Sequence, residues 1–285
     1  MQNQIEVLNT FFLIVSFVLG CMIGSFLNVC VWRLPRNESV VKPRSKCPQC
    51  GTPIAWYDNI PIVSWLALGA KCRHCHTWIS WQYPLVEALT GVLFACVYAR
   101  FGLCMATPVY MAVCAGLVLV TFVDLADWTI PNEVTFPGIP LGLACSLVGM
   151  FYPESGFLTR DVFDSLFGIL LGGGILYLLD KLTRLLLKKP GMGFGDVKLL
   201  AMLGAFLGWR SILVIIMLAS LVGSAVGVTL VIIQKRKGIE EEAHYLPFGP
   251  YLAAAGLLFL FFGQSMIDFY LGMMHAPEPV SVFPS

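Results

Sequence analysis

Eight stretches of apolar residues, most of them long enough to cross a lipid bilayer, constrain this chain more than any other feature of its sequence. The hydrocarbon core of a bilayer is about 30 Å thick, and a helix of about 20 apolar residues spans it. With 58% hydrophobic residues and a mean hydropathy of +0.79, the 285-residue chain has too little polar surface for a water-soluble globule. The stretches run approximately over residues 7–32, 84–99, 105–123, 134–152, 162–179, 197–209, 212–233 and 246–274.

We therefore predict an all-α polytopic membrane protein with about eight transmembrane helices. The stretch 197–209 is short and interrupted by glycines, so it is the least typical span. The one sizeable polar segment lies between the first two spans. These patterns divide the chain into a first transmembrane helix over 1–32, a polar insert over 33–83, and a multi-helix membrane domain over 84–285.

The charge of the chain excludes a nucleic-acid partner and sets the expected orientation. A net charge of +1, from 18 basic and 17 acidic residues, lacks the concentrated positive patch that nucleic-acid binding requires. Fifteen of the 18 basic residues fall in the alternate loops 33–83, 181–198 and 235–237. Because Lys and Arg are retained in cytoplasmic loops, we expect these loops to be cytoplasmic and both termini to lie outside the cytoplasm.

Pairs of glycines four residues apart recur in the apolar stretches. Such pairs let the backbones of two membrane helices approach closely, and we expect them to serve packing alone. The pairs are Gly20/Gly24, Gly138/Gly142, Gly168/Gly172, Gly204/Gly208 and Gly223/Gly227.

Four of the ten cysteines form a pattern in the polar insert. Cys47 and Cys50 make one CxxC motif, and Cys72 and Cys75 make a second one after 21 intervening residues. Two such motifs can supply four thiolates in a tetrahedron around zinc. An insert of this size has little hydrophobic core of its own, so we predict a structural zinc ion that supplies folding energy. A redox-active or unpaired set of thiols is the alternative interpretation.

Two aspartates at the ends of spans are candidate catalytic residues. Asp124 ends the third span and Asp196 begins the sixth, and the predicted orientation places both at the cytoplasmic boundary. Two carboxylates that share a site do not both ionise readily, so one keeps a proton while the other acts as a base. That arrangement suits the attack of water on a peptide carbonyl group. Taken separately, each aspartate is equally well explained as a helix cap or an interfacial acid.

Two glycines directly before Asp196 are candidate substrate-approach residues. Gly193 and Gly195 carry no side chain, so the backbone of a substrate has room to come close to Asp196.

Two polar residues in the first two spans have structural interpretations. Asn28 lies inside the first span, where we expect it to hydrogen-bond a neighbouring helix. Glu87 follows Pro84 in the expected first turn of the second span, where an acid is favourable to the helix dipole.

Several motifs together give the chain a resemblance to a known family. They are Gly24-Ser25-Phe26-Leu27-Asn28-Val29 with Arg33-Leu34-Pro35, the double CxxC, Tyr83-Pro84-Leu85-Val86-Glu87, Asp124 with Ile130-Pro131-Asn132, and Gly193-Phe194-Gly195-Asp196-Val197-Lys198. In these residues the chain resembles the type IV prepilin leader peptidases and N-methyltransferases, which are membrane aspartic peptidases of the GxGD type. The motifs run from the first span to the sixth.

The resemblance implies an enzyme with two activities. It implies removal of the short basic leader of prepilins and pseudopilins at the cytoplasmic membrane face, followed by N-methylation of the new terminus with S-adenosylmethionine. The catalytic aspartates of the family match Asp124 and Asp196, which leaves Asp127 as a solvated neighbour. The implied setting is the lipid of a bacterial inner membrane, in type IV pilus assembly or type II secretion. No residue of the methyl-donor site can be named from the sequence.

Two other functions remain as alternatives. An ion-coupled transporter also uses intramembrane carboxylates and glycine-rich helices, but it predicts acids at the midplane and inverted repeats. A thiol oxidoreductase would use the CxxC pairs as its active site. That enzyme would place its thiols outside the cytoplasm, whereas the basic loops predict the insert to be inside.

Overall fold

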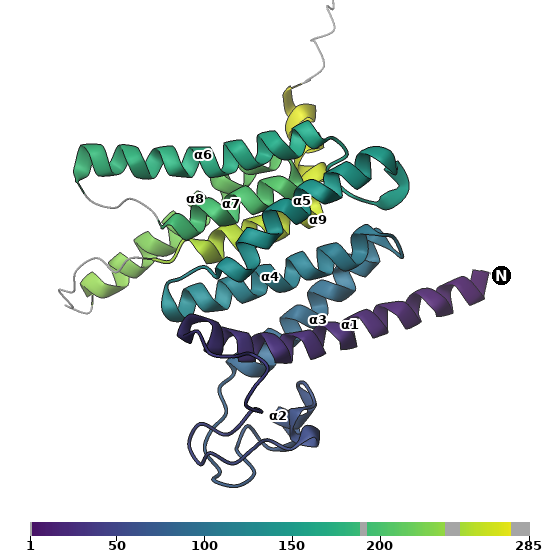
Figure 1. Cartoon of the computed structure of the whole chain (residues 1–285), viewed down its shortest axis with the longest axis vertical. Coiled ribbons are helices and arrows are strands. Elements are labelled where there is room, and N and C mark those ends of the chain that lie inside the picture. The colour runs from purple at the N-terminus through teal and green to yellow at the C-terminus, as the bar shows by residue number, and fades with distance from the viewer. Residues whose placement is uncertain (1, 189–192, 237–245, 275–285) are drawn as a thin grey trace, which may run out of the picture.

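The computed structural model describes residues 2–188, 193–236 and 246–274, and nearly all the regular elements in these ranges are helices (Figure 1). Two isolated β-bridges, Lys46 with Pro53 and Lys71 with Trp78, lie in the insert. The long helices are α1 (Gln2–Arg33), α3 (Gln82–Phe101), α4 (Ala106–Asp127), α5 (Asn132–Phe151), α6 (Val162–Leu187), α7 (Phe194–Leu207), α8 (Trp209–Arg236) and α9 (Gly249–Met274). The short ones are η1 (Leu34–Arg36), η2 (Trp56–Asn59), α2 (Val63–Ala67) and η3 (Pro153–Ser155).

Seven of these helices are long and apolar enough to cross a membrane. They correspond to seven of the eight predicted spans. The eighth, α7, has 14 residues and is therefore about 21 Å long, which is shorter than the hydrocarbon core. Gly208 ends it in a backbone conformation with φ +78°, and α8 starts at the next residue. Eleven of the 14 residues of α7 are buried.

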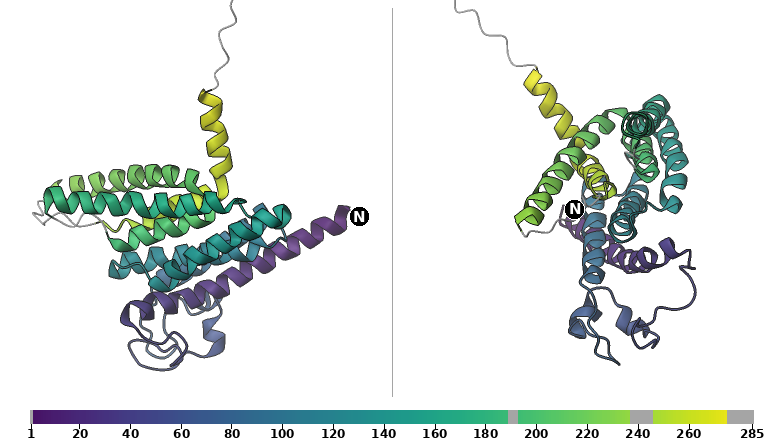
Figure 2. Two further views of the ribbon diagram at one scale, coloured as in Figure 1. Left: turned by 45° about the horizontal axis from the view of Figure 1, so that its top comes forward. Right: turned by 90° about the vertical axis from the view of Figure 1, so that its left-hand side faces the viewer.

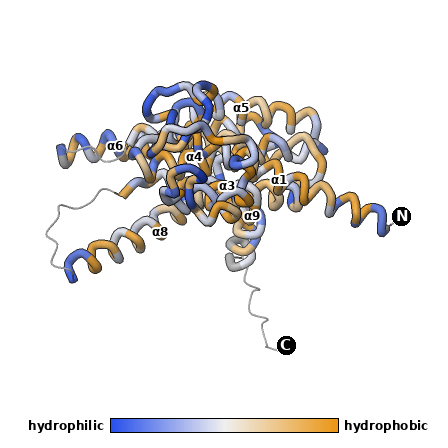
Figure 3. The backbone as a smooth tube through the Cα atoms, turned by 90° about the horizontal axis from the view of Figure 1, so that it is seen from below, coloured by the Kyte–Doolittle hydropathy of each residue, from blue (hydrophilic) through white to orange (hydrophobic). Residues whose placement is uncertain are grey.

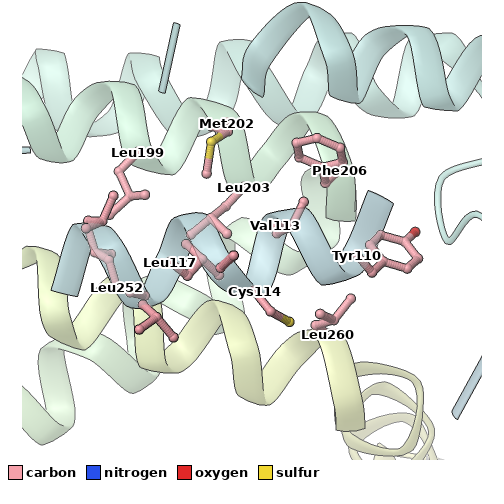
Figure 4. Packing of buried hydrophobic residues seen from close by; sticks show 14 of the residues in the cluster. Tyr110, Val113, Cys114, Leu117, Leu199, Met202, Leu203, Phe206, Leu252 and Leu260 are labelled. Atoms are coloured by element: carbon pink, nitrogen blue, oxygen red, sulfur yellow. The ribbon is translucent and has the colours of Figure 1, made fainter. Parts of the chain in front are cut away.

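The helices pack in two connected groups, and α7 lies inside one of them (Figures 1 and 2). On one side α1 lies along α3, and α4 packs against both. On the other side α7 is enclosed by α5, α6, α8 and α9. The core where the groups meet contains Tyr110 and Leu117 of α4, Leu203 and Phe206 of α7, and Leu252 of α9 (Figure 4).

One end of the bundle brings together segments that are far apart in the sequence. An ion pair of 4.0 Å between Arg36 and Asp127 joins η1 to the end of α4. The amide of Gly249 at the start of α9 donates to Asp124 on α4. The insert hangs from this end, and the N-terminus lies at the opposite end (Figure 1). The ends of α6 and α8 that reach the insert end are hydrophilic, in contrast to the mostly apolar helices (Figure 3).

Four of the five predicted glycine pairs lie in close helix contacts. A Cβ atom on Gly20 or Gly24 would lie 2.6–2.7 Å from the backbone of α3, and a Cβ on Gly142 would lie 2.6 Å from Ala205 of α7. Gly168 of α6 and Gly204 of α7 touch through their backbones. The fifth pair, Gly223/Gly227, differs: a Cβ on Gly227 meets no described atom within 4 Å.

This contrast predicts the effect of a matched pair of substitutions. We expect Gly204→Ala to destabilise the protein by about 1–3 kcal/mol, because the added methyl group overlaps the backbone of Gly168. Gly227→Ala is the control, since it makes the same change in a helix without an overlap. Thermal unfolding of both variants in detergent is the measurement, and an equal unfolding midpoint for the two would contradict the packing described here.

Candidate active site

The two aspartates predicted as a pair are brought into one buried site. Asp124 stands one turn before the end of α4, and Asp196 is the third residue of α7. Their exposed fractions are only 5% and 7%. The side chain of Ile130 contacts both Gly195, next to Asp196, and Gly249, which contacts Asp124, so the two acids border the same small region. Two buried acids in this arrangement can divide the roles of base and proton donor.

A third element of the site, the start of α9, was missed by the sequence analysis. The backbone N–H of Gly249 donates to Oδ2 of Asp124 over 3.1 Å. A Cβ atom on Gly249 would lie only 2.5 Å from the same oxygen. The glycine is therefore required for the close approach of α9, whose N-terminal end is favourable to a carboxylate. The only signal in the sequence was the position of Gly249 between Pro247 and Pro250. This pattern indicates the start of a helix but gives no indication of a contact with Asp124.

The turn between α4 and α5 holds the two aspartate-bearing helices together. Trp128 ends α4 with φ +58° and turns the chain back toward α7. The side chain of Ile130 packs against both Gly195 and Gly249, which have no room for a Cβ beside it. Nζ of Lys198 on α7 donates to Oδ1 of Asn132 at the start of α5. These contacts give a structural reason for the Ile130-Pro131-Asn132 motif.

The two glycines before Asp196 have different surroundings. A Cβ on Gly195 would lie 2.9 Å from the side chain of Ile130, so this residue is packed inside the site. A Cβ on Gly193 would have Oδ2 of Asp196, at 3.4 Å, as its nearest neighbour. Among the described residues, Gly193 thus leaves space directly beside the carboxyl group, whereas the space at Gly195 is already taken by Ile130. Asp127, expected to be a solvated neighbour, is partly exposed and pairs with Arg36.

The four cysteines of the insert form a cluster that can hold a metal ion. Their sulfur atoms all lie within 4.8 Å of one another, and Sγ of Cys47 is 3.7 Å from Sγ of Cys75. Four thiolates around zinc, each at about 2.3 Å, are about 3.8 Å apart in a regular tetrahedron. The size and the chemistry of the cluster therefore fit a tetrahedral thiolate site.

The two CxxC motifs have the same local structure. In the first, the N–H of Cys47 donates to Thr52 and the N–H of Gly51 donates to Cys47. In the second, Cys72, Thr77 and His76 repeat this pattern at the equivalent positions. Gly51 and His76 both have positive φ, +69° and +55°.

The second residue of each pair of cysteines is biased toward the thiolate form. Hydrogen bonding by Thr77 lowers the pKa of Cys75 to about 6, and hydrogen bonding by Thr52 likewise lowers the pKa of Cys50. Thiolates are the form that binds metal ions.

The insert is docked onto α1 and α3 by polar groups. Nδ2 of Asn28 donates to the carbonyl oxygen of Tyr83 over 3.1 Å, which confirms the expected bond to a neighbouring helix. The guanidinium of Arg33 donates to the carbonyl oxygens of Ser39 and Pro43. Oε2 of Glu87 accepts the backbone N–H of Ile62 over 2.7 Å. The expectation for Glu87 was wrong, because α3 begins at Gln82 and places this residue beyond the first turn, where it is buried.

The sequence matches two family models. The bacterial peptidase A24 N-terminal domain matches residues 18–101, and the type IV leader peptidase family matches residues 111–228. No solved structure matches the chain at a significant level.

Curated relatives match over most of the chain. The prepilin leader peptidase/N-methyltransferase of Myxococcus xanthus is 40% identical over 232 residues, which cover 81% of this chain and 67% of the relative. The protein of the same name from Aeromonas salmonicida is 36% identical over 280 residues, covering 90% of this chain and 92% of the relative. The one from Pseudomonas aeruginosa is 35% identical over 283 residues, covering 91% and 93%.

Proposed function

Since the chain belongs to the type IV leader peptidase family, we propose that it removes the leader of type IV prepilins and then N-methylates the new terminus. The observation that carries the peptidase activity is the buried pair of Asp124 and Asp196, which lies inside the segment that matches the family.

The two aspartates divide the work of hydrolysis. The ionised carboxylate takes a proton from a water molecule, whose oxygen then attacks the carbonyl carbon of the scissile peptide bond. The protonated partner gives its proton to the carbonyl oxygen, and a proton then passes to the leaving nitrogen. Gly249 holds Asp124 through its N–H, so the orientation of one acid is fixed before a substrate enters. The substrate backbone approaches through the space beside Gly193. Gly195 contributes indirectly, because its missing side chain lets α7 pack on Ile130.

The location of the pair suits a membrane-anchored substrate. Both acids lie at the end of the bundle that carries the basic insert. Basic loops face the cytoplasm, so this end is cytoplasmic and both termini are periplasmic in a bacterial inner membrane. A prepilin or pseudopilin, held in lipid by an apolar helix, would present its basic leader and its scissile bond at this face.

The insert and the membrane helices have separate roles in this proposal. The first helix over 1–32 and the insert over 33–83 form one unit with the start of α3, and residues 84–285 include the peptidase. Cys47, Cys50, Cys72 and Cys75 hold a structural zinc ion, because a site closed by four thiolates has no open position for chemistry. S-adenosylmethionine, the donor implied by the methyltransferase name, supplies the methyl group when bound.

The ion-coupled transporter is not favoured. The family is one of peptidases, and both aspartates lie near the ends of their helices instead of at the midplane.

Substitution of the two aspartates tests the catalytic pair. Asp124→Asn and Asp196→Asn should each lower leader cleavage by at least about a hundredfold, because each removes a positioned acid or base. Asp127→Asn is the control and should keep cleavage. A co-expressed prepilin is scored by mass spectrometry for loss of its leader and gain of one methyl group. Normal cleavage by either dyad variant would remove that aspartate from the mechanism.

Substitution of Gly249 tests the role of the start of α9 in the site. Gly249→Ala should reduce cleavage by about a hundredfold, because the methyl group displaces the Asp124 carboxylate from its position. Gly174→Ala on α6 meets no described atom within 4 Å and serves as the control. Rates are compared at equal amounts of inserted protein, and equal rates for the two variants would contradict the assigned role of Gly249.

The zinc content of the protein tests the proposed metal site in the insert. Purified protein should contain one zinc ion per chain by elemental analysis, and Cys72→Ser should lose it because only three thiolates remain. Cys96→Ser, at an exposed cysteine of α3 outside the cluster, should keep it. Zinc retained in full by Cys72→Ser, or absent from the unmodified protein, would refute the proposed site.

A further inference from the structure

A cavity of about 640 Å³ lies between the insert and the helices α1 and α3. Its wall includes Asn28 and Trp32 of α1, Tyr83 and Glu87 of α3, and Trp65 of the insert. Pockets of about 300–1,000 Å³ hold ligands of the size of a nucleoside derivative. The catalytic aspartates are not among the residues that line it.

Among the described residues, two buried polar groups in this wall are incompletely paired: one lacks a hydrogen bond and the other lacks a positive charge. Asn28 is 5% exposed, and its Oδ1 atom has no hydrogen-bond partner among the described residues. Glu87 is 7% exposed, and its contacts are the N–H of Ile62 and the side chain of Ser25, with no cation among the described residues. A buried carboxylate is normally paired with a positive charge, so Glu87 is suited to a ligand that brings one.

The backbone next to Glu87 is strained in a way that fixes the carboxylate. Ile62 has φ +61°, which is rare for a β-branched residue, and its N–H points to Oε2 of Glu87. Strained residues of this kind persist where the surroundings impose them, and they are concentrated at functional sites. The contact orients Glu87 without neutralising it.

We propose that this cavity is the binding site for S-adenosylmethionine, with Glu87 facing the sulfonium group. The inference rests on the proposed methyltransferase function. A sulfonium is a cation without hydrogen-bond donors, so a carboxylate is suited to stabilise it by charge alone. Trp65, whose ring is tilted by 51° against that of Trp81 with the ring centres 4.3 Å apart, offers an aromatic surface to the adenine ring.

The position of the cavity fits a reaction that follows cleavage. Trp32 and Arg33 on its edge are followed by Arg36, which is paired with Asp127 at the end of α4. Asp127 is one turn beyond Asp124, so the two sites are neighbours at the same end of the bundle. All residues of the cavity also lie within 18–101, the part that matches the N-terminal model, whereas both aspartates lie within the peptidase model.

The reaction at this site is balanced with the donor and the new terminus alone. The terminal amine, in its neutral form, uses its lone pair to bond the methyl carbon. The carbon–sulfur bond breaks, and its electron pair goes to sulfur, which leaves S-adenosylhomocysteine with a neutral thioether. The product is a methylated ammonium ion, so the positive charge moves from sulfur to nitrogen.

The test compares the affinities of the charged and the neutral ligand. Protein in detergent, without prepilin, is titrated calorimetrically with S-adenosylmethionine and with S-adenosylhomocysteine. Glu87→Gln should weaken binding of S-adenosylmethionine by at least about tenfold, while S-adenosylhomocysteine keeps its affinity within about twofold. Glu6→Gln, at an exposed position near the start of α1, is the matched control and should change neither. Equal affinity of Glu87→Gln and the unmodified protein for S-adenosylmethionine would overturn the proposal.

A second measurement tests the proposal even if Glu87→Gln does not fold. The unmodified protein is crosslinked to radiolabelled S-adenosylmethionine by ultraviolet light, and the labelled peptide is identified. Label within residues 25–87 supports the cavity as the binding site, and label confined to residues 111–228 overturns this proposal. Because neither assay contains a prepilin, their failure is distinguishable from failure of the proposed peptidase, which is measured by loss of the leader.

Discussion

The position of the aspartate pair depends on the packing of α7, a helix that is too short to cross the bilayer. Lipid provides no hydrophobic force between helices, so α7 is held by close van der Waals packing. Gly168 and Gly204 bring α6 and α7 into backbone contact, and Gly142 does the same between α5 and α7. Because neighbouring helices enclose α7, the position of Asp196 near its start is fixed. The pair of aspartates is thus a consequence of small residues placed far from them.

Two buried carboxylates in this molecule are each oriented by a hydrogen bond from a backbone N–H. Asp124 accepts the N–H of Gly249, and Glu87 accepts the N–H of Ile62. A backbone N–H orients a carboxylate and offsets part of its desolvation cost, but it adds no full positive charge. A Lys or Arg partner would neutralise the group and occupy its reactive side. In the functions that we propose, each acid therefore remains available, one for water and a peptide bond and the other for a cation.

The sequence was sufficient for the parts of the fold that depend on local patterns. Apolar length gave the spans, two CxxC motifs gave the cysteine cluster, and the unusual location of Asp124 and Asp196 singled them out. It could not give contacts that depend on how distant helices cross. Gly249 is 125 residues from Asp124, and nothing near it in the sequence indicates that its missing side chain admits a carboxylate. The cavity was equally hidden, because it exists only between the folded insert and the α1–α3 pair.

The charge state of the amine that each proposed reaction needs favours separate sites for the two reactions. Hydrolysis at the aspartate pair, as we propose it, leaves a new amine beside a shared negative charge, which favours its ammonium form. An ammonium has no lone pair and cannot accept a methyl group. In the cavity that we propose for the donor, its sulfonium offsets the charge of Glu87, so an amine that enters meets little net negative charge. It loses its proton more readily there than at the aspartates. The short distance between the ends of α1 and α4 then matters, because the product of one site has to reach the other while its helix stays in the membrane.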